Sequence, residues 1–311
     1  MLKKVLIGMA VVMLLGLVSF EIYFQSHSSA DPAVERENSG MDFVELSHGK
    51  TYYKLHGKSG DPLLVLIHGI STPHFVFDGL IEDFVKNGHQ VLVYDLLGRG
   101  LSDKPRIDYQ KEVFPQQLAE MLKTLELHET PKVLVGYSMG GVVAAMYTQE
   151  NPKYVLAHVY IAPGGFFKIE KPAIFTALPQ FVLERMIFLN SMSYYKKMKP
   201  KSLDAAERFK TQSHFSGYYY ALMSTIVHFE DVRSVYRDVM KQKKPTLFIW
   251  GLNDKMVPYE KSEELLQQYP EKGVVVVEDA SHAINLTHPE KVSSEIKSFL
   301  KERAIFSSVQ P

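Results

Sequence analysis

The chain has 311 residues, of which 46% are hydrophobic and 23% are charged, and such a composition is typical of an ordinary globular protein. This composition excludes a disordered or collagen-like chain and a membrane protein with many spans. Lys and Arg together number 35, as do Asp and Glu, so the charge balance gives no indication of a nucleic-acid partner. The sequence contains no cysteine, which excludes disulfides, thiolate zinc sites and a cysteine nucleophile.

Residues 1–24 are predicted to form a membrane anchor or a signal segment. Two lysines precede an unbroken apolar run over residues 5–20, and three more apolar residues follow Glu21. About twenty apolar residues in a helix match the roughly 30 Å hydrocarbon core of a bilayer. Ser28 and Ala30 would suit a signal-peptidase site, but the apolar run is longer than the usual 7 to 15 residues.

We therefore favour an uncleaved, single-pass anchor. The lysines at positions 3 and 4 would stay in the cytoplasm, which places the rest of the chain on the extracytoplasmic side. The alternative is a secreted or periplasmic protein after cleavage. Residues 25–41 are polar and contain Pro and Gly, so they are expected to be a linker, and the folded domain is predicted to cover residues 42–306.

The domain is predicted to be an α/β fold with an eight-stranded, mostly parallel sheet flanked by helices. Segments 43–47 and 51–56 alternate in hydrophobicity around a Gly-containing turn and predict a hairpin. Runs that are apolar throughout are typical of strands covered by helices on both faces, and helix-length segments separate the runs here. These predicted strands cover residues 63–67, 90–95, 132–136, 156–161, 246–250 and 273–278.

More than eighty residues separate the predicted strands 156–161 and 246–250. This stretch is too long for a crossover and too apolar for a loop, so we predict an inserted helical cap over about residues 164–243. Its aromatic side chains would either line a pocket for an apolar acyl chain or pack the core of the cap itself. Its basic cluster would either meet anionic lipid headgroups or form a solvated helix face; the cluster comprises Lys196, Lys197, Lys199 and Lys201.

The segment Gly136-Tyr137-Ser138-Met139-Gly140 follows a predicted strand and precedes a predicted helix. A sharp turn in this G-x-S-x-G setting presents the serine alone at the carboxyl edge of the sheet, and Gly136 and Gly140 keep other side chains away from it. The sequence lacks the GKS or GKT of a phosphate loop. We therefore predict that Ser138 is a nucleophile.

A serine nucleophile needs a histidine base and an acid that orients the base. His282 is the preferred base because it follows the last predicted strand, whereas His288 precedes Pro289 and fits a helix start better. Asp254 is the preferred acid because it follows the seventh predicted strand, and Asp279 is expected to be a loop carboxylate. The order Ser138, Asp254, His282 matches the chain order of a triad on such a sheet.

The backbone amides of Ile70 and Met139 are predicted to form the oxyanion hole. Met139 follows the nucleophile, and Ile70 lies in the loop after the predicted strand 63–67, where Gly69 allows the backbone to approach a substrate. His68 also lies at the end of that strand, and we expect it to support the loop rather than to act as a base.

These motifs together resemble the α/β-hydrolase family, in particular its cap-bearing serine hydrolases such as the monoacylglycerol lipase-like and ABHD6-like enzymes. The resemblance covers about residues 42–306 and includes a D-x-x-G-x-G-x-S stretch at 95–102, GYSMGG at 136–141, WGLNDKMVP at 250–258 and SHAINLTHPE at 281–290. Ser138 argues against the family's dehalogenases and epoxide hydrolases, which have aspartate at this position.

The resemblance implies a carboxylic ester hydrolase that acts through an acyl-enzyme, with no cofactor and no metal. The expected substrate is an apolar acyl ester such as a monoacylglycerol or a lysophospholipid. One alternative is a C–C bond hydrolase of the same fold, although the segment HGISTP departs from the glycine-rich loop of that subfamily. The other alternative is a non-catalytic ligand-binding protein on this fold.

Overall fold

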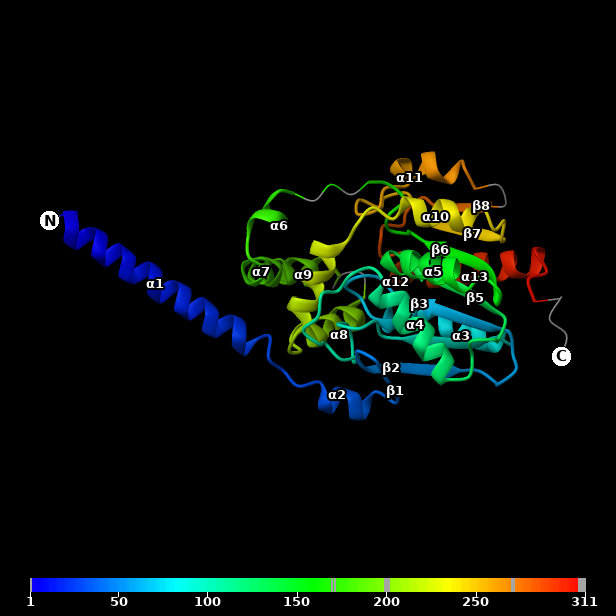
Figure 1. Cartoon of the computed structure of the whole chain (residues 1–311), viewed down its shortest axis with the longest axis horizontal. Coiled ribbons are helices and arrows are strands. Elements are labelled where there is room, and N and C mark those ends of the chain that lie inside the picture. The colour runs from blue at the N-terminus through cyan, green and yellow to red at the C-terminus, as the bar shows by residue number, and fades with distance from the viewer. Residues whose placement is uncertain (1, 169, 171, 199–201, 270–271, 307–311) are drawn as a thin grey trace.

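The computed structural model describes residues 2–168, 170, 172–198, 202–269 and 272–306. Its centre is an eight-stranded sheet with the order β1-β2-β4-β3-β5-β6-β7-β8 (Figure 1). β1 and β2 form an antiparallel hairpin, β2 is antiparallel to β4, and all other neighbours are parallel. The fold class and the eight predicted strands are thereby confirmed. The strands are β1 Asp42–Leu46, β2 Gly49–His56, β3 Leu63–Ile67, β4 Gln90–Tyr94, β5 Lys132–Tyr137, β6 Val155–Ile161, β7 Thr246–Gly251 and β8 Lys272–Val277.

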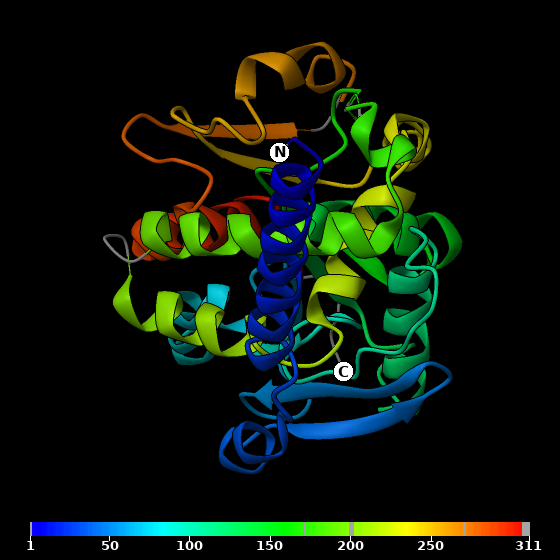
Figure 2. The same cartoon turned by 90° about the vertical axis from the view of Figure 1, so that its left-hand side faces the viewer.

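The central strands are buried almost along their whole length because both faces of the sheet are covered. Every residue of β3, β4, β5 and β7 is buried, whereas β8, at the edge, is mostly half-buried. Two groups of helices provide the cover, and Figure 2 shows them on opposite sides of the sheet. One group is α4 Val113–Thr124, α5 Met139–Glu150 and α10 Arg233–Met240, and the other is α3 Asp78–Lys86 and α13 Pro289–Glu302.

Short helices complete the domain near the ends of the strands. A 3-10 turn, η1, leads directly into α3. The helix α11 lies between β7 and β8, and α12 immediately precedes α13. These elements are η1 His74–Phe77, α11 Tyr259–Leu266 and α12 Ile284–Thr287.

The long insertion is helical, and four of its helices lie together over one end of the sheet (Figure 1). We call these four the cap segment: α6 Ile174–Ala177, α7 Gln180–Met198, α8 Leu203–Ser213 and α9 Tyr218–His228. The next helix, α10, packs against α5, and its Tyr236 belongs to the main core instead. Of the predicted basic cluster, Lys196 and Lys197 are exposed near the end of α7, while Lys199 and Lys201 lie outside the described residues.

Most of the described aromatic side chains of the cap segment pack against one another. A second hydrophobic cluster contains Phe188, Phe209, Tyr218 and Tyr219, all buried. Phe24, from the end of the N-terminal helix, lies in the same cluster. These rings therefore form a core of the cap segment that also includes the N-terminal helix.

The N-terminal helix α1, Leu2–Ser26, projects away from the domain, and only its last turns touch it (Figure 1). The segment that we expected to be a linker contains a short helix, α2 Ala33–Asn38. Arg36 fastens this helix to the domain, because its guanidinium donates to Asp103 Oδ1 at 2.6 Å and to the Leu101 carbonyl at 2.9 Å. The composition of residues 25–41 suggested a free linker, because composition contains no information about contacts with residues far away in the chain.

One histidine in the sheet makes the fold sensitive to acid. His158 on β6 is fully buried, and its Nε2–H donates to Thr148 Oγ1 at 2.9 Å, since that hydroxyl itself donates to the Ala144 carbonyl. Burial, with Lys244 nearby, lowers the pKa of His158 from 6.5 to about 3. The folded protein therefore holds this ring neutral over a pH range in which the unfolded chain protonates it.

We predict that His158→Leu reduces the pH dependence of stability. In the wild type, the contribution of the neutral His158 to the free energy of unfolding is fully present above about pH 6.5. It is lost as the pH falls toward 3, at about 1.4 kcal/mol per pH unit. Denaturant unfolding at several pH values across this window measures the slope. The control is the exposed His128→Leu. Equal slopes for wild type and His158→Leu would contradict the prediction.

Candidate active site

Ser138 lies at the sharp turn between β5 and α5, with backbone angles of φ 53° and ψ −120°. Few non-glycine residues adopt a positive φ, so the surrounding contacts must maintain this strained conformation. The Ser138 amide donates to the Ile161 carbonyl at 2.9 Å, and its carbonyl accepts from the amides of Gly141 and Gly164, both at 3.0 Å. Neighbouring backbone segments therefore hold the serine on three sides.

Both glycines of the turn are needed because backbone atoms approach them closely. A Cβ at Gly140 would lie 2.0 Å from the Ile67 carbonyl oxygen, and one at Gly136 would lie 2.5 Å from the Gly140 carbonyl oxygen. No side chain fits at either position without moving the main chain. The lack of Cβ atoms allows the start of α5 to pack directly against the end of β3.

The structure brings Ser138, His282 and Asp254 together in a hydrogen-bonded chain. His282 Nε2 lies 3.2 Å from Ser138 Oγ, and His282 Nδ1 lies 2.7 Å from Asp254 Oδ2. The Asp254 side chain is fully buried, and its other oxygen accepts from the amides of Met256 and Val257 at 2.8 and 2.9 Å. Because the carboxylate is fixed by the turn after β7, it can hold the imidazole in one orientation.

The residues that we set aside lie elsewhere. His288 Nε2 pairs with Asp279 Oδ1 at 3.1 Å, and Asp279 is exposed. His288 is also the residue immediately before α13, consistent with the expected helix start. The pair therefore lies outside the chain of contacts that reaches Ser138.

Sequence reasoning missed the contribution of Tyr137. Its hydroxyl donates to the main-chain carbonyl of His282 at 2.8 Å, and its ring lies 5.2 Å from the imidazole, centroid to centroid. Burial raises the pKa of Tyr137 well above its usual value, so the phenol stays protonated and remains a donor. Tyr137 occupies a variable position of G-x-S-x-G, and no sequence signal connects it with a residue 145 positions away.

The loop that carries Ile70 passes close to Ser138. A Cβ at Gly69 would lie only 3.1 Å from the Ser138 Cβ. The backbone at Gly69 therefore lies directly beside the serine. His68 Nδ1–H donates to the Gly69 carbonyl at 2.7 Å, and its Nε2 accepts from the Leu96 amide at 2.9 Å. The bond to the Gly69 carbonyl orients the peptide whose N–H belongs to Ile70.

His68 is fully buried, and burial lowers its pKa to about 4. The ring is therefore neutral at pH 7 and forms no ion pair with Asp95, 3.8 Å away. Asp95 is buried too and accepts from His74 Nδ1 at 2.8 Å and from the Leu101 amide at 2.8 Å. Burial alone would raise the pKa of Asp95, but the charge and hydrogen bonds of His74 outweigh it and hold that pKa below its usual value.

Arg99 is a second feature that the sequence did not reveal. The side chain is fully buried, and its guanidinium donates to the Ile70 carbonyl at 2.9 Å, the Leu97 carbonyl at 3.2 Å and Thr225 Oγ1 at 2.7 Å. Burial lowers the pKa of Arg99 to about 10, which leaves it charged at neutral pH. Arg99 therefore connects the Ile70 loop to α9 of the cap segment.

Met139 begins α5, and the amides in the first turn of a helix have no carbonyl four residues earlier to bind. Ser138 and Met139 are 8% and 5% exposed, so the site is nearly closed. A small cavity of about 10 Å³ adjoins Met139, and its walls are largely apolar, with Phe114, Val142 and Phe229 among them. Among the described residues, no cluster of His, Asp and Glu has the arrangement of a metal site.

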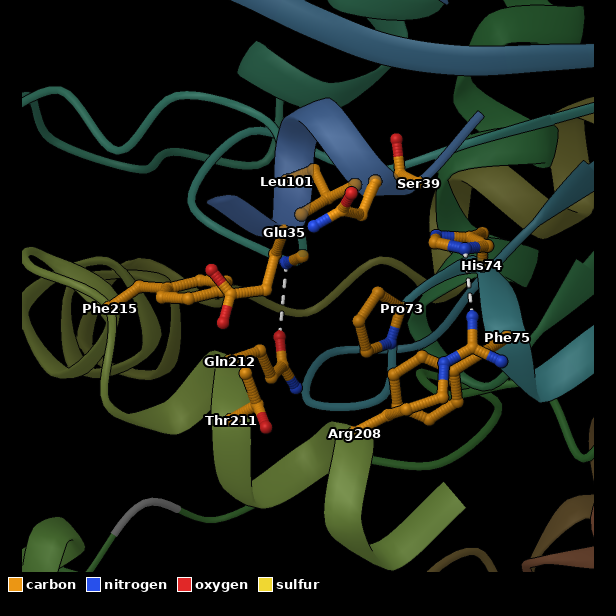
Figure 3. Close-up of a pocket in the computed structure, with 12 residues that line it drawn as sticks. Glu35, Ser39, Pro73, His74, Phe75, Leu101, Arg208, Thr211, Gln212 and Phe215 are labelled. Atoms are coloured by element: carbon orange, nitrogen blue, oxygen red, sulfur yellow. Dashed lines mark hydrogen bonds between the residues drawn. The ribbon is translucent and has the colours of Figure 1, made fainter. Parts of the chain in front are cut away.

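A larger pocket of about 350 Å³ lies apart from these residues (Figure 3). Pro73 lines it from the loop after β3 and His74 and Phe75 line it from η1, with α2 and α8 supplying most of the other walls. Figure 3 shows Arg208 and Phe215 at opposite sides of the pocket. Neither Ser138 nor His282 lines it.

Comparison with known proteins identifies the family of the chain. Residues 62–289 match the family model described as the alpha/beta hydrolase fold. The chain is 24% identical over 284 residues to a monoacylglycerol lipase of Xenopus laevis, a match that covers 85% of this chain and 84% of the relative. It is 27% identical over 289 residues to Lipase 1 of Psychrobacter immobilis, covering 85% and 86%.

A solved structure shows the same fold. The esterase from Exiguobacterium antarcticum superposes with a TM-score of 0.69 at 20% identity, covering 83% of this chain and 98% of that one. The family model spans most of the chain, and the eight-stranded, mostly parallel sheet is the one that the sequence predicted. The chain therefore belongs to the α/β-hydrolase fold family and is a hydrolase of its lipase and esterase type.

Proposed function

We propose that the protein is a serine esterase in which Ser138, His282 and Asp254 form a catalytic triad. The observation that carries the proposal is the position of His282, whose two ring nitrogens lie 3.2 Å from Ser138 Oγ and 2.7 Å from Asp254 Oδ2. A histidine between a hydroxyl and a buried carboxylate can take the hydroxyl proton while the carboxylate stabilises the resulting imidazolium. No other described histidine has both contacts.

In the proposed mechanism Ser138 Oγ attacks the ester carbonyl carbon, and its proton passes to His282 Nε2. The carbonyl oxygen becomes an oxyanion, which the amides of Ile70 and Met139 stabilise. The imidazolium then protonates the leaving alcohol, and an acyl-enzyme remains. Water repeats the sequence with His282 as the base, which releases the acid and restores Ser138.

Replacement of Ser138 or His282 by alanine is expected to lower the turnover of a p-nitrophenyl ester by roughly 10⁴- to 10⁶-fold, because neither residue is effective without the other. Asp254→Asn should lower it by about 10⁴-fold, since the imidazole then loses its orienting carboxylate. A fluorophosphonate probe should label the wild type and leave Ser138→Ala unlabelled.

Two variants in the neighbouring loop serve as controls for these substitutions. His288→Ala and Asp279→Asn alter the same residue types without touching the hydrogen-bonded chain, and both should keep near wild-type turnover. Wild-type turnover or labelling in Ser138→Ala would refute the proposed nucleophile.

We also propose that the substrate is an apolar acyl ester, such as a monoacylglycerol or a lysophospholipid. The names of the relatives, monoacylglycerol lipase and lipase, support this substrate class. The buried aromatic rings of the cap segment do not contribute to this argument, since they pack against one another.

For a series of p-nitrophenyl esters we expect kcat/KM to rise from acetate to medium and long acyl chains. Each buried methylene is worth about 0.8 kcal/mol, which corresponds to about fourfold per carbon until the binding surface is filled. The Ser138→Ala protein provides the background rate. Activity confined to acetate would rule out the lipid substrate, and turnover of a vinylogous diketone without ester hydrolysis would favour a C–C hydrolase.

We further propose that α1 is an uncleaved, single-pass membrane anchor that leaves the catalytic domain on the extracytoplasmic side. Its most apolar stretch has a mean hydropathy of 2.5, and none of it is buried in the domain. A signal peptide would satisfy the same test, but the end of α1 is part of the folded domain. Phe24 is only 5% exposed, and its ring centroid lies 5.1 Å from that of Phe188 and 5.9 Å from that of Tyr219.

Cleavage near Asp31 would remove Phe24 and uncover Phe188 and Tyr219. We therefore expect the protein recovered from membranes to have the mass of the whole chain, 35.4 kDa. Intact-mass spectrometry measures this mass. Ala30→Leu, which would block a signal peptidase, should change the mass only by the difference between the two side chains. A mature product that begins at Asp31 would contradict the anchor.

A further inference from the structure

The end of α1 and the cap helix α7 are joined by an ion pair and by aromatic packing. The Arg185 guanidinium donates to both carboxylate oxygens of Glu21, with Nη2 to Oε1 at 2.6 Å and Nε to Oε2 at 3.1 Å. The same guanidinium lies 4.2 Å from the centre of the Phe24 ring. Phe188, one turn further along α7, contacts Phe20 and Phe24. α7 therefore lies at the point where α1 leaves its free apolar stretch.

The face of α7 that meets α1 also carries exposed apolar side chains. Phe181 and Leu189 are both 60% exposed and lie four residues before and after Arg185, so they flank the contact with α1. Met186 on α7 and Ile174 on α6 are each 40% exposed. In the view of Figure 2, α7 runs crosswise behind α1. A helix that crosses an anchor in this way lies in the plane of the membrane surface if the anchor spans the bilayer.

The free part of α1 is short for a bilayer. Phe20 contacts Phe188, Glu21 is held by Arg185 and Phe24 is buried, so the apolar stretch that is free of the domain covers only residues 5–19. Fifteen residues in a helix span about 22 Å, about 8 Å less than a typical hydrocarbon core. An interfacial helix buries its apolar face by about 5 to 10 Å, which is enough to make up this difference. Because α1 and α7 are held together, a bilayer that covers the apolar part of α1 also brings the exposed face of α7 to the hydrocarbon.

From these contacts we propose that the outer face of α7, with Phe181 and Leu189 on either side of Arg185, is a membrane-binding surface inserted in the leaflet from which α1 emerges. The proposal rests on α1 being an uncleaved anchor. The partner is a lipid surface, and the exposed Lys196 and Lys197 near the end of α7 place positive charge where anionic headgroups would lie. The insertion holds the cap segment against the layer from which a lipid ester would be drawn.

The absence of cysteine makes a direct test possible. Phe181→Cys and Leu189→Cys, each labelled with an environment-sensitive fluorophore, report the depth of α7 when the full chain is reconstituted in phosphatidylcholine and phosphatidylglycerol vesicles. Lipids with a quencher near the headgroup should quench both probes strongly. The control is Lys301→Cys, which is exposed on α13 at the end of the domain opposite α1 (Figure 1). Quenching at 181 and 189 no greater than at 301 would overturn the proposal.

A second copy of the chain is the competing occupant of this face. In that case the fluorescence change at 181 and 189 would depend on the ratio of protein to lipid and would persist without quenching lipid, which also overturns the proposal. The depth measurement needs no enzymatic activity. An intact quenching pattern with no ester hydrolysis would therefore refute the proposed esterase and leave the membrane surface standing.

Activity provides an independent readout. The double variant Phe181→Ser, Leu189→Ser is expected to lose about tenfold or more in rate on a vesicle-embedded lipid ester, because it no longer buries two large apolar side chains. Its rate on a soluble short-chain ester should be retained, which also shows that it is folded. Phe43→Ser on β1, with a wild-type side chain 48% exposed, is the matched control and should change neither rate. Equal vesicle rates for the double variant and the wild type would overturn the proposal.

Discussion

The contact between the start of α5 and the end of β3 is the constraint on which the rest of the site depends. The contact is possible only because Gly140 has no Cβ. A Cβ at this position would lie 2.0 Å from the Ile67 carbonyl oxygen. This close packing forces Ser138 into a positive φ and raises its side chain above the carboxyl edge of the sheet. It also places the first amide of α5 beside the loop after β3. One steric requirement thus positions both the serine and the groups proposed to stabilise an oxyanion.

Polar side chains buried beneath the site keep its loops in place. His68 and Asp95 fix the ends of β3 and β4, and Arg99 joins the Ile70 carbonyl to Thr225 on α9. A buried guanidinium is costly unless its N–H groups find acceptors, and here two carbonyls and a hydroxyl accept from it. Because these bonds link the loop to the cap segment, the proposed oxyanion hole and the cap segment are mechanically connected.

The N-terminal helix joins the same framework from the other side. Its last turns are part of the hydrophobic cluster of the cap segment, and Ile70 packs against that cluster as well. A chain of packed side chains therefore runs from the proposed membrane anchor through the cap segment to the loop beside Ser138. By composition α1 is only an apolar helix. These contacts make its last turns a structural part of the hydrolase domain.

The sequence by itself determined the strands, the turn at Ser138 and the candidates His282 and Asp254. Periodicity and glycine spacing are local properties, and the carboxyl ends of parallel strands must meet at one edge of the sheet. Only the tertiary structure showed that the Tyr137 hydroxyl reaches the His282 carbonyl and that the buried Arg99 donates to the Ile70 carbonyl. It also decided that the cap aromatics pack with Phe24 rather than standing alone. These features join residues far apart in the chain, and composition and periodicity contain no information about which distant side chains will meet.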